Sequence, residues 1–326
     1  MVLTTVYFNG SAWLPNAVQN TFNRWEPSSS ATMAYRLFRR DLVELNTFAW
    51  TSQGAVHHAA KLMSKASDKD EVRSVLDYGP DPGRRGDTLA VHARQHFKDI
   101  DNWLRLATLV FAASSLELFV RRVVALSLRS DPGMLIGSSR AVDGITALKE
   151  GRELDIRSHL KSTTEGVWSS REVGLSKIFG GRVDVVYDNV KDLHAIQTLR
   201  NSVAHDFART GKKGDFWYVD PELALPEAVS RLSASRLQTL LRLISLVAEQ
   251  IEKWAAPHIG VFELILFWHS FLEERNKPRT TVVKRYVELY KEGGVEKLLS
   301  TYSHAMVGRP IGREYSADLL RHYDAC

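Results

Sequence analysis

The sequence predicts an all-α protein, a helical bundle with additional helical segments at its N- and C-terminal ends. Three observations support this fold class. Long stretches repeat apolar residues every three or four positions, which is the spacing of helices that bury one face. Clusters of glycine, proline and serine separate those stretches, as turns between helices do. Segments with a β-forming composition are short and fall at residues 2–8 and 216–219.

Residues 1–94 form the predicted N-terminal helical extension. The serine cluster at residues 28–30 is expected to cap a helix over residues 31–66. Residues 79–86 read GPDPGRRG and form the clearest loop of the chain. This loop lacks the Gly-Lys-Ser/Thr of a phosphate-binding P-loop, so its two arginines are interpreted as a solvated corner rather than a phosphate contact.

Residues 95–258 form the predicted central bundle, and residues 261–326 form a C-terminal helical extension. The bundle is expected to contain three long helices, at about residues 88–128, up to residue 207 and at 235–254. The second carries an apolar stripe that begins at Val186, and Asp188 or Asn189 is expected to cap its start. In the C-terminal extension, shorter helices are expected at residues 262–274, 281–291, 295–302 and 316–322. Residues 216–219 are expected to form a small hairpin arm of the bundle.

The composition is that of a soluble globular protein with a mild basic excess. Of the 326 residues, 44% are hydrophobic and 25% are charged, and the formal net charge is +5. This charge permits an acidic partner such as RNA without requiring one. The single cysteine, Cys326, argues against an intrachain disulfide and a cysteine-based metal site, and it favours a reducing, cytoplasmic setting.

No targeting or membrane-spanning segment is expected. The N-terminal residues lack the basic start and long apolar middle of a signal peptide. The longest apolar run, residues 106–120, is interrupted by polar residues and is shorter than the roughly 18 residues that a membrane span requires. We therefore expect a core helix there, and no membrane partner.

The most informative stretch is residues 193–207, which reads LHAIQTLRNSVAHDF. Asn201 directly follows Arg200, and His205 follows five residues after Arg200. On a helix, Asn201 and His205 lie one turn apart on one face, and Arg200 lies about 100° around the axis. A cation, an amide and an imidazole thus leave the end of one helix close together.

These residue types suit proton transfer at a phosphate, as in the cleavage of RNA. Histidine transfers protons near neutral pH because its ordinary pKa is about 6.5, so His205 is the candidate acid and base. Arg200 is the candidate for stabilising the negative transition state, since its planar fork stays charged and donates parallel hydrogen bonds to phosphate. Asn201 is expected to orient either group through its amide.

Basic residues follow the motif and are candidates for RNA binding. From residue 200 to residue 213, four basic residues stand against one acidic residue, Asp206, which leaves a local charge of +3. The three basic residues downstream of the motif are Arg209, Lys212 and Lys213.

The pattern Arg-Asn-x-x-x-His resembles the signature of the HEPN superfamily. Residues 103–128, WLRLATLVFAASSLELFVRRVVALSL, are similar to the long first helix of that fold, including the polar Ser115 and Glu117 within the apolar run. Residues 237–254 are similar to its closing helix. The resemblance covers residues 95–258, about half of the chain.

The resemblance implies a metal-independent endoribonuclease that works as a homodimer and needs no cofactor. Two motifs would face one cleft, so that two copies of Arg200 and His205 share the acid and base roles. The products would carry a 2′,3′-cyclic phosphate and a 5′-hydroxyl. The biological role would be that of a toxin or antiviral defence effector, restrained by an antitoxin or another defence-system protein.

One departure from the family bears on this control. In one HEPN branch, an antitoxin modifies a tyrosine two residues after the histidine. That position is Phe207 here, and it has no hydroxyl to modify. Control by that route is therefore not expected.

The motif also has a structural interpretation. A carboxylate on an apolar helix face usually has a buried partner, and Glu117 could pair with Arg200, which could alternatively pair with Asp206. His205 would then only cap the helix C-terminus, where a cation gains about 0.3–1 kcal/mol. The chain would be a non-catalytic helical module that binds RNA or a protein through the same basic end.

Other histidines are weaker candidates. His92 and His96 have the spacing of paired zinc ligands on a helix, but the glutamate of a metalloprotease helix is missing between them. The adjacent pair His57 and His58, and His269 within an apolar segment, are interpreted as structural residues.

Overall fold

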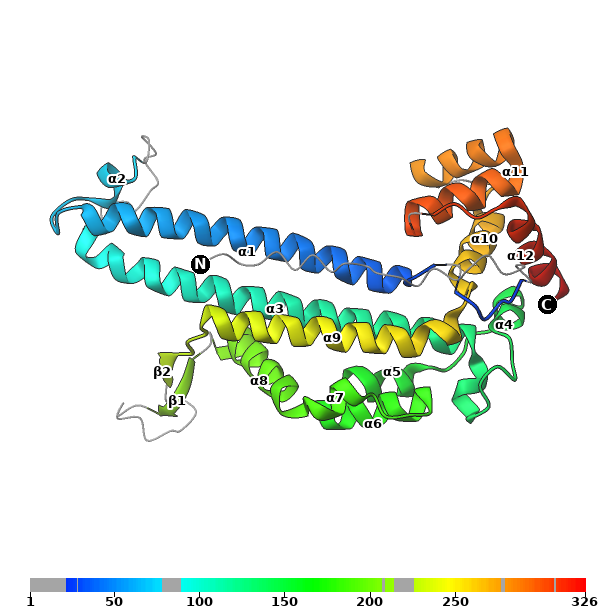
Figure 1. Ribbon diagram of the computed structural model, residues 1–326, viewed down its shortest axis with the longest axis horizontal. Coiled ribbons are helices and arrows are strands. Elements are labelled where there is room, and N and C mark those ends of the chain that lie inside the picture. The colour runs from blue at the N-terminus through cyan, green and yellow to red at the C-terminus, as the bar shows by residue number, and fades with distance from the viewer. Residues whose placement is uncertain are drawn as a thin grey trace.

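The computed structural model describes residues 22–27, 29–77, 89–206, 209–213, 226–276, 279–307 and 309–326. Within these ranges, the side chains at 205, 206, 209–213, 226–229 and 307 are not described. Helices dominate the described chain, which confirms the all-α class (Figure 1). The helices are α1 (Met33–Lys65), α2 (Val72–Val75), α3 (Ala90–Ser130), η1 (Pro132–Ile136), α4 (Gly144–Lys149), α5 (Arg157–Thr164), α6 (Trp168–Phe179), α7 (Asp184–Asp188), α8 (Val190–Asp206), α9 (Ala234–Ile259), α10 (Phe262–Glu274), α11 (Thr281–Val307) and α12 (Arg313–Ala325).

Three long helices form the frame of the molecule. Helix α3 lies between α1 and α9, and α1 runs antiparallel to both (Figure 1). The side chain of Asn102 on α3 holds the start of α9. Its amide oxygen accepts a hydrogen bond from the backbone N–H of Leu232, and its amide nitrogen donates one to the Ser230 carbonyl. Helix α3 is therefore the central element against which the other parts of the fold pack.

The hydrophobic core lies along residues 106–120 of α3, the apolar run for which a core helix was predicted. Leu106, Leu109 and Phe119 are almost completely buried in it. The ring centres of Phe38 and Phe119 lie 5.4 Å apart, so this pair packs the start of α1 against the middle of α3. Aromatic pairs at this separation contribute about 0.5–1.5 kcal/mol beyond the area that they bury.

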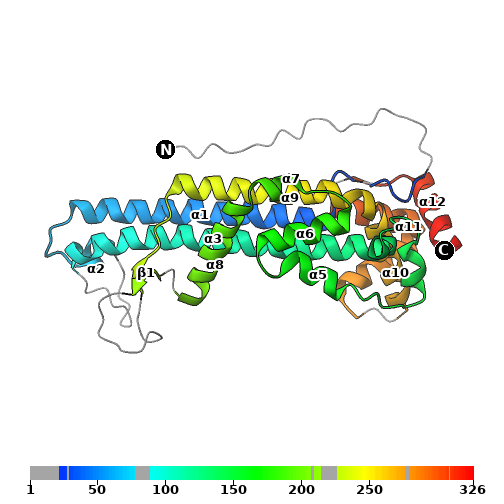
Figure 2. The ribbon, with the colours of Figure 1, turned by 90° about the horizontal axis from the view of Figure 1, so that it is seen from below.

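A second layer of shorter helices covers one side of α3 and α9. Helices α5, α6, α7 and α8 lie on this side, and α8 crosses α3 obliquely (Figure 2). The motif helix is α8, and it begins directly after Asn189, one of the two predicted caps, whereas Val186 of the apolar stripe lies on the separate helix α7. The Asn189 amide donates to the Val185 carbonyl at 2.9 Å and takes the place of a continuing helical bond there. The predicted apolar stripe does face the core, where Val186, Leu193 and Ile196 are buried.

A two-stranded antiparallel sheet follows α8. Strand β1 (Arg209–Lys213) pairs with β2 (Pro226–Val229), with Arg209 opposite Val229. The β-prone residues 216–219, predicted as a small hairpin arm, lie between these strands and outside the described residues. The hairpin carries the predicted RNA-binding residues away from the bundle (Figure 1).

The C-terminal helices α10, α11 and α12 form a unit at one end of the frame (Figure 1). The two helices expected at residues 281–291 and 295–302 are the two halves of α11, which is kinked at Gly293 and Gly294. Apolar residues from α1 to α12 belong to one continuous core cluster. The boundary predicted between residues 94 and 95 falls inside α3, so the N-terminal and central parts share one helix.

None of the described helices alone has the length and hydropathy to cross a bilayer. Helices α9 and α10 meet the criterion only when they are taken together, and they are bent by 61° relative to each other.

A buried glutamate, Glu252, and a half-buried one, Glu263, hold the start of α1. The N-cap is Thr32 rather than one of the predicted serines, and its amide and hydroxyl donate to Glu252 at 2.5 and 2.7 Å. Glu263 accepts from the next amide, that of Met33, at 3.0 Å. Acceptors from α9 and α10 thus satisfy amides that a helix start leaves unpaired.

Candidate functional site

Glu117 lies at the centre of a polar cluster that joins three helices. Its Oε1 accepts a hydrogen bond from Arg171 Nη1 of α6 at 3.0 Å, and its Oε2 accepts one from Arg200 Nη2 of α8 at 3.0 Å. One carboxylate on α3 therefore serves two guanidinium groups. The pair between Glu117 and Arg200 is the one that the sequence named as an alternative to Asp206.

Arg171 is the structural member of this cluster. It is 4% exposed, its Nε donates to the Gly166 carbonyl at 3.0 Å, and its guanidinium lies 5.1 Å from the ring centre of Trp168. A buried cation is tolerated only when its charge and donors have partners, and the Glu117 carboxylate supplies the opposite charge. Sequence reasoning missed Arg171, because no local pattern shows that residues 54 positions apart meet.

Arg200 is the accessible member of the cluster. Its side chain is 31% exposed, and its Nη1 donates to the Asn201 side-chain oxygen at 3.0 Å. Two of the five N–H donors of a guanidinium are therefore used by described residues, and its position is fixed by a carboxylate and an amide. With two guanidinium groups and one carboxylate, the cluster has an excess of one positive charge at the surface. That excess suits an anion such as a phosphate.

The remaining motif residues extend beyond this cluster. His205 and Asp206 lie in the last turn of α8, and the backbone of His205 is about 7.5 Å further along the helix axis than that of Arg200. Arg209, Lys212 and Lys213 lie on β1, directly after α8. Their side chains are outside the described part of the chain, so the convergence of His205 with Arg200 stays a prediction.

The chain matches no protein family model, no curated protein and no solved structure.

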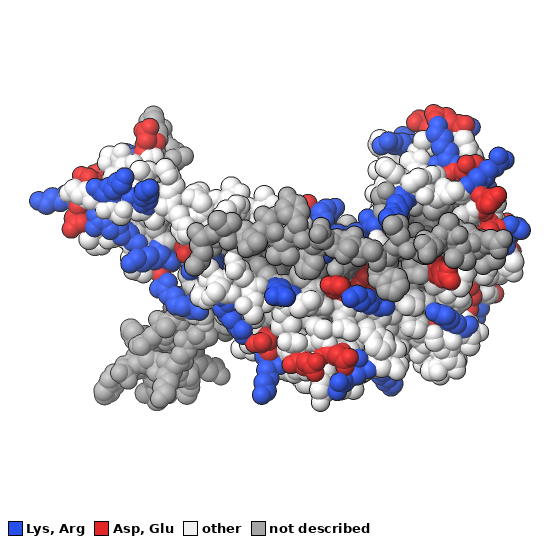
Figure 3. All heavy atoms as spheres, viewed as in Figure 1, with Lys and Arg blue, Asp and Glu red and all other residues white. Residues whose placement is uncertain are grey.

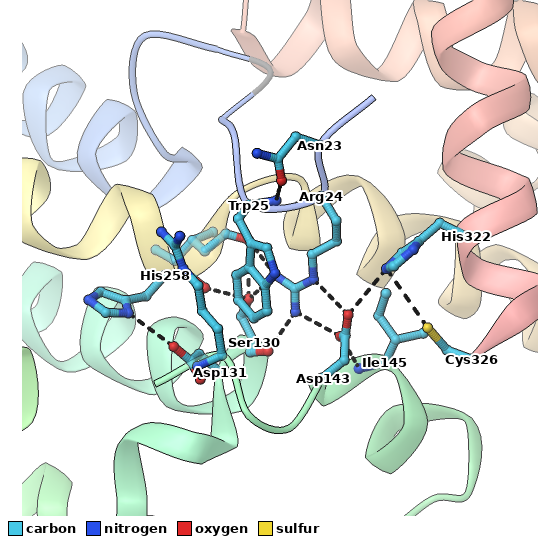
Figure 4. Close-up of polar contacts among 12 residues, drawn as sticks. Asn23, Arg24, Trp25, Ser130, Asp131, Asp143, Ile145, His258, His322 and Cys326 are labelled. Carbon is cyan, nitrogen blue, oxygen red and sulfur yellow. Dashed lines mark hydrogen bonds and ion pairs between the residues drawn. The ribbon is translucent and has the colours of Figure 1, made fainter. Parts of the chain in front are cut away.

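A second polar cluster, centred on Arg24, was not predicted from the sequence (Figure 4). Arg24 is 3% exposed and donates to both oxygens of Asp143, at 2.8 and 3.1 Å, and to the Ser130 carbonyl at 2.6 Å. Burial alone would raise the pKa of Asp143, but the hydrogen bond and charge of Arg24 outweigh it and hold that pKa below its ordinary value. This cluster ties the N-terminal segment to the C-terminal end of α3.

Cys326, the single cysteine of the chain, adjoins this second cluster. Ligand atoms of Asp143, His322 and Cys326 lie within 4.8 Å of one another, which suits a metal ion by distance. Arg24 nevertheless occupies both Asp143 oxygens, so a metal ion would meet a guanidinium charge. The cluster is satisfied as a polar anchor without an ion.

A serine, a histidine and an aspartate also meet at the end of α3. Asp131 Oδ2 accepts from Ser139 Oγ at 2.6 Å and lies 3.1 Å from His258 Nδ1. In a catalytic triad, the serine and the aspartate contact opposite nitrogens of the imidazole. Here Ser139 lies 3.2 Å from the same nitrogen that faces Asp131, so the arrangement is a loop anchor rather than an activated nucleophile.

The histidines that the sequence treated as structural or surface residues lie as follows. His92 and His96 are exposed on α3, and His57 and His58 are exposed on α1. His269 is partly buried, and its Nδ1 lies 2.8 Å from the hydroxyl of Tyr323.

Proposed function

We propose that the protein is a metal-independent endoribonuclease of HEPN type that acts as a homodimer. The observation that carries the proposal is the placement of Arg200, an accessible guanidinium held by Glu117 and Asn201 one and a half turns before His205 on the same helix. The resemblance of the motif to the HEPN signature supports the same chemistry. A toxin or antiviral defence effector is the proposed role, with RNA as the substrate.

The proposed reaction is an internal transesterification of RNA. One His205 takes the proton from a ribose 2′-hydroxyl, and the 2′-oxygen forms a bond to the adjacent phosphorus. Arg200 donates to the phosphate oxygens as negative charge gathers on them. The bond from phosphorus to the 5′-oxygen breaks, and the His205 of the second copy protonates the leaving oxygen. The products are a 2′,3′-cyclic phosphate and a 5′-hydroxyl, without a metal ion in any step.

Rigid placement of Arg200 favours this role. Glu117 and Asn201 restrict the guanidinium to one position, so less conformational entropy is lost when it binds a phosphate. Glu117 also keeps the buried Arg171 neutralised, so that the excess charge lies at the partly exposed Arg200. In this proposal Glu117 is a positioning residue, while Arg200 and His205 contact the RNA.

The test is RNA cleavage in EDTA by the wild type and by Arg200→Ala and His205→Ala. Each variant is expected to cut at least about 100-fold more slowly, which is the lower bound both for loss of a proton-transfer group, His205, and for loss of a donor to the transition state, Arg200. Arg182→Ala is the matched control, since Arg182 is an exposed arginine paired only with neighbours on its own segment. Equal rates for all four proteins would place the activity elsewhere.

The alternative is a non-catalytic module that binds RNA or a protein through the same basic end. The ion pair between Arg200 and Glu117 is the observation that favours it, because a structural arginine makes the same contact. RNA binding that survives in His205→Ala, without cleavage by the wild type, is the outcome that this alternative predicts.

A further inference from the structure

We infer that an open groove between α3 and the segment that contains α5 binds the phosphate backbone of single-stranded RNA beside the Arg200 site. The groove has a volume of about 700 Å³ and is lined by both helices and by the loop before α5. The inference rests on the proposed ribonuclease function, because it names the surface on which the substrate strand lies.

Four basic side chains line the groove, two from each wall. Arg121 and Arg129 come from α3, and Arg157 and Lys161 come from α5. The spacing along α3 is about 12 Å, and the pair on α5 is one helical turn apart, or about 6 Å. Positive charges spread along two walls fit a linear polyanion better than a single compact anion.

These four cations have no competing partner in the described chain. None of them makes an ion pair with a described residue, and all four side chains are exposed. Two carboxylates, Glu153 and Asp155, also line the groove. Four positive charges against two negative charges leave an excess of two. Elsewhere exposed arginines pair with carboxylates, as Arg231 does with Asp99 and Arg236 with Asp192, and basic and acidic side chains are intermixed over the C-terminal helices (Figure 3).

The groove continues the Arg200 site along α3. Arg121 follows Glu117 by four residues, so the two side chains lie on one face of the helix, one turn apart. From Glu117 to Arg129 the helix rises about 18 Å. A strand with one phosphate at Arg200 would thus find further basic side chains as it runs toward the C-terminal end of α3.

The lining indicates that the backbone is recognised rather than the bases. None of the residues that line the groove is aromatic, so the groove offers no platform on which bases could stack. Arginine and lysine contacts to phosphate carry no sequence information. We therefore expect weak sequence preference and a strong dependence of the affinity on salt.

The experiment measures binding of a fluorescent 2′-O-methyl oligouridine to the full chain by anisotropy, over a series of KCl concentrations. This probe lacks the free 2′-hydroxyl and is not cut by the proposed reaction, so binding is read without cleavage. The variants are Arg121→Gln/Arg129→Gln and Arg157→Gln/Lys161→Gln. The control is Lys284→Gln/Arg285→Gln, which removes the same charge from exposed positions on α11.

Each groove variant is expected to bind about tenfold or more weakly at low salt, and to reduce the steepness of log K against log salt by about 1.4, since two phosphate contacts are lost. The control is expected to change neither value by a comparable amount. If the wild type does not bind, or if groove and control variants behave alike, the groove assignment is overturned.

Cleavage of unmodified RNA separates this inference from the proposed function. Groove variants are expected to need more RNA for half-maximal rate while the maximal rate stays near the wild-type value. Cleavage by the wild type with unchanged binding in the groove variants overturns the groove alone. Groove-dependent binding by a wild type that never cuts RNA overturns the ribonuclease proposal alone.

Discussion

The carboxylate of Glu117 links the stability of the fold to the candidate site at Arg200. It holds the buried Arg171 with one oxygen and the accessible Arg200 with the other. Removing its charge leaves Arg171 buried without a counter-charge, and that is far more costly than the loss of an exposed ion pair. The same change frees Arg200 from its fixed position.

Glu117→Gln is expected to lower the free energy of unfolding by about 2 kcal/mol, as measured by urea denaturation. This is below the full cost of breaking a buried pair, because Glu117 and Arg200 are partly exposed. The matched control is Glu249→Gln, which breaks an exposed pair with Lys253 on α9 and is expected to cost less than about 0.5 kcal/mol. Equal losses in the two variants would show that Glu117 does not balance Arg171.

At the scale of elements, the kink of α11 depends on Gly294. This residue has φ +65° and ψ −159°, a conformation that is available almost only to glycine. Gly294→Ala is therefore expected to destabilise the protein by about 1–3 kcal/mol, although the added methyl group would meet no neighbouring atom within 4 Å.

The same substitution in α1 provides the control for this prediction. Gly54 lies inside a regular helix and also has no atom within 4 Å of an added methyl group. Gly54→Ala is expected to stabilise the protein by about 0.5–1 kcal/mol because alanine loses less backbone entropy in a helix. A thermal melt that ranked the two variants the other way would contradict a kink that depends on the backbone of Gly294.

The start of α1 carries a pH-dependent contribution. The pKa of Glu263 is raised from 4.5 to about 7. Burial is the largest cause and the charge of Glu252 adds to it, while the hydrogen bond from Met33 and the charge of Arg36 oppose it. The unfolded chain loses this proton near pH 4.5, whereas the folded protein keeps it until about pH 7. Stability from this group is therefore complete below pH 4.5 and falls as the pH rises to 7.

Glu263→Gln is expected to remove that fall and to stabilise the protein at pH 8 by up to roughly 3 kcal/mol, since its amide oxygen still accepts from Met33. Unfolding free energies at pH 5 and pH 8 test this directly. Glu274→Gln, an exposed change on the same helix, is expected to leave the pH dependence unaltered. If the free energy of unfolding of the wild type does not decline between pH 5 and pH 8, the prediction that ionised Glu263 destabilises the folded protein is contradicted.

At the scale of the whole molecule, one core joins parts that the sequence suggested as separate. The helix pattern and turn clusters predicted the bounds of α1 and α10 and the start of α11 closely, because these signals are local. Asn189 was predicted as a possible cap of the motif helix, and α8 does begin directly after it, but the separate helix α7 was not predicted, since the apolar stripe already begins at Val186. The contacts of Arg24 and Arg171 were also missed, because they join positions more than 50 residues apart.

The candidate site was predictable to a similar degree. Arg200 and Asn201 could be named from their spacing, and Glu117 could be named as a partner because a carboxylate on an apolar face needs one. Nothing local indicated the groove beside the site, since Arg121 and Arg157 come together only when α5 packs against α3.

The proposed cleavage requires a homodimer. If two copies of His205 are needed for one cleavage event, the specific activity is expected to rise with protein concentration until the dimer saturates. Cleavage rates over a dilution series, with light scattering at each concentration, test this. A monomer with full activity at every dilution would exclude the paired site.

Metal-independent cleavage of RNA is tested most directly by mapping the ends of the RNA fragments that the purified protein produces in EDTA. Cleavage through Arg200 and His205 is expected to leave a 2′,3′-cyclic phosphate on one fragment and a 5′-hydroxyl on the other, and mass spectrometry distinguishes both from hydrolytic ends. These products should disappear in His205→Ala. Fragments with 3′-hydroxyl and 5′-phosphate ends, or cyclic phosphates that persist in His205→Ala, would contradict the proposed chemistry.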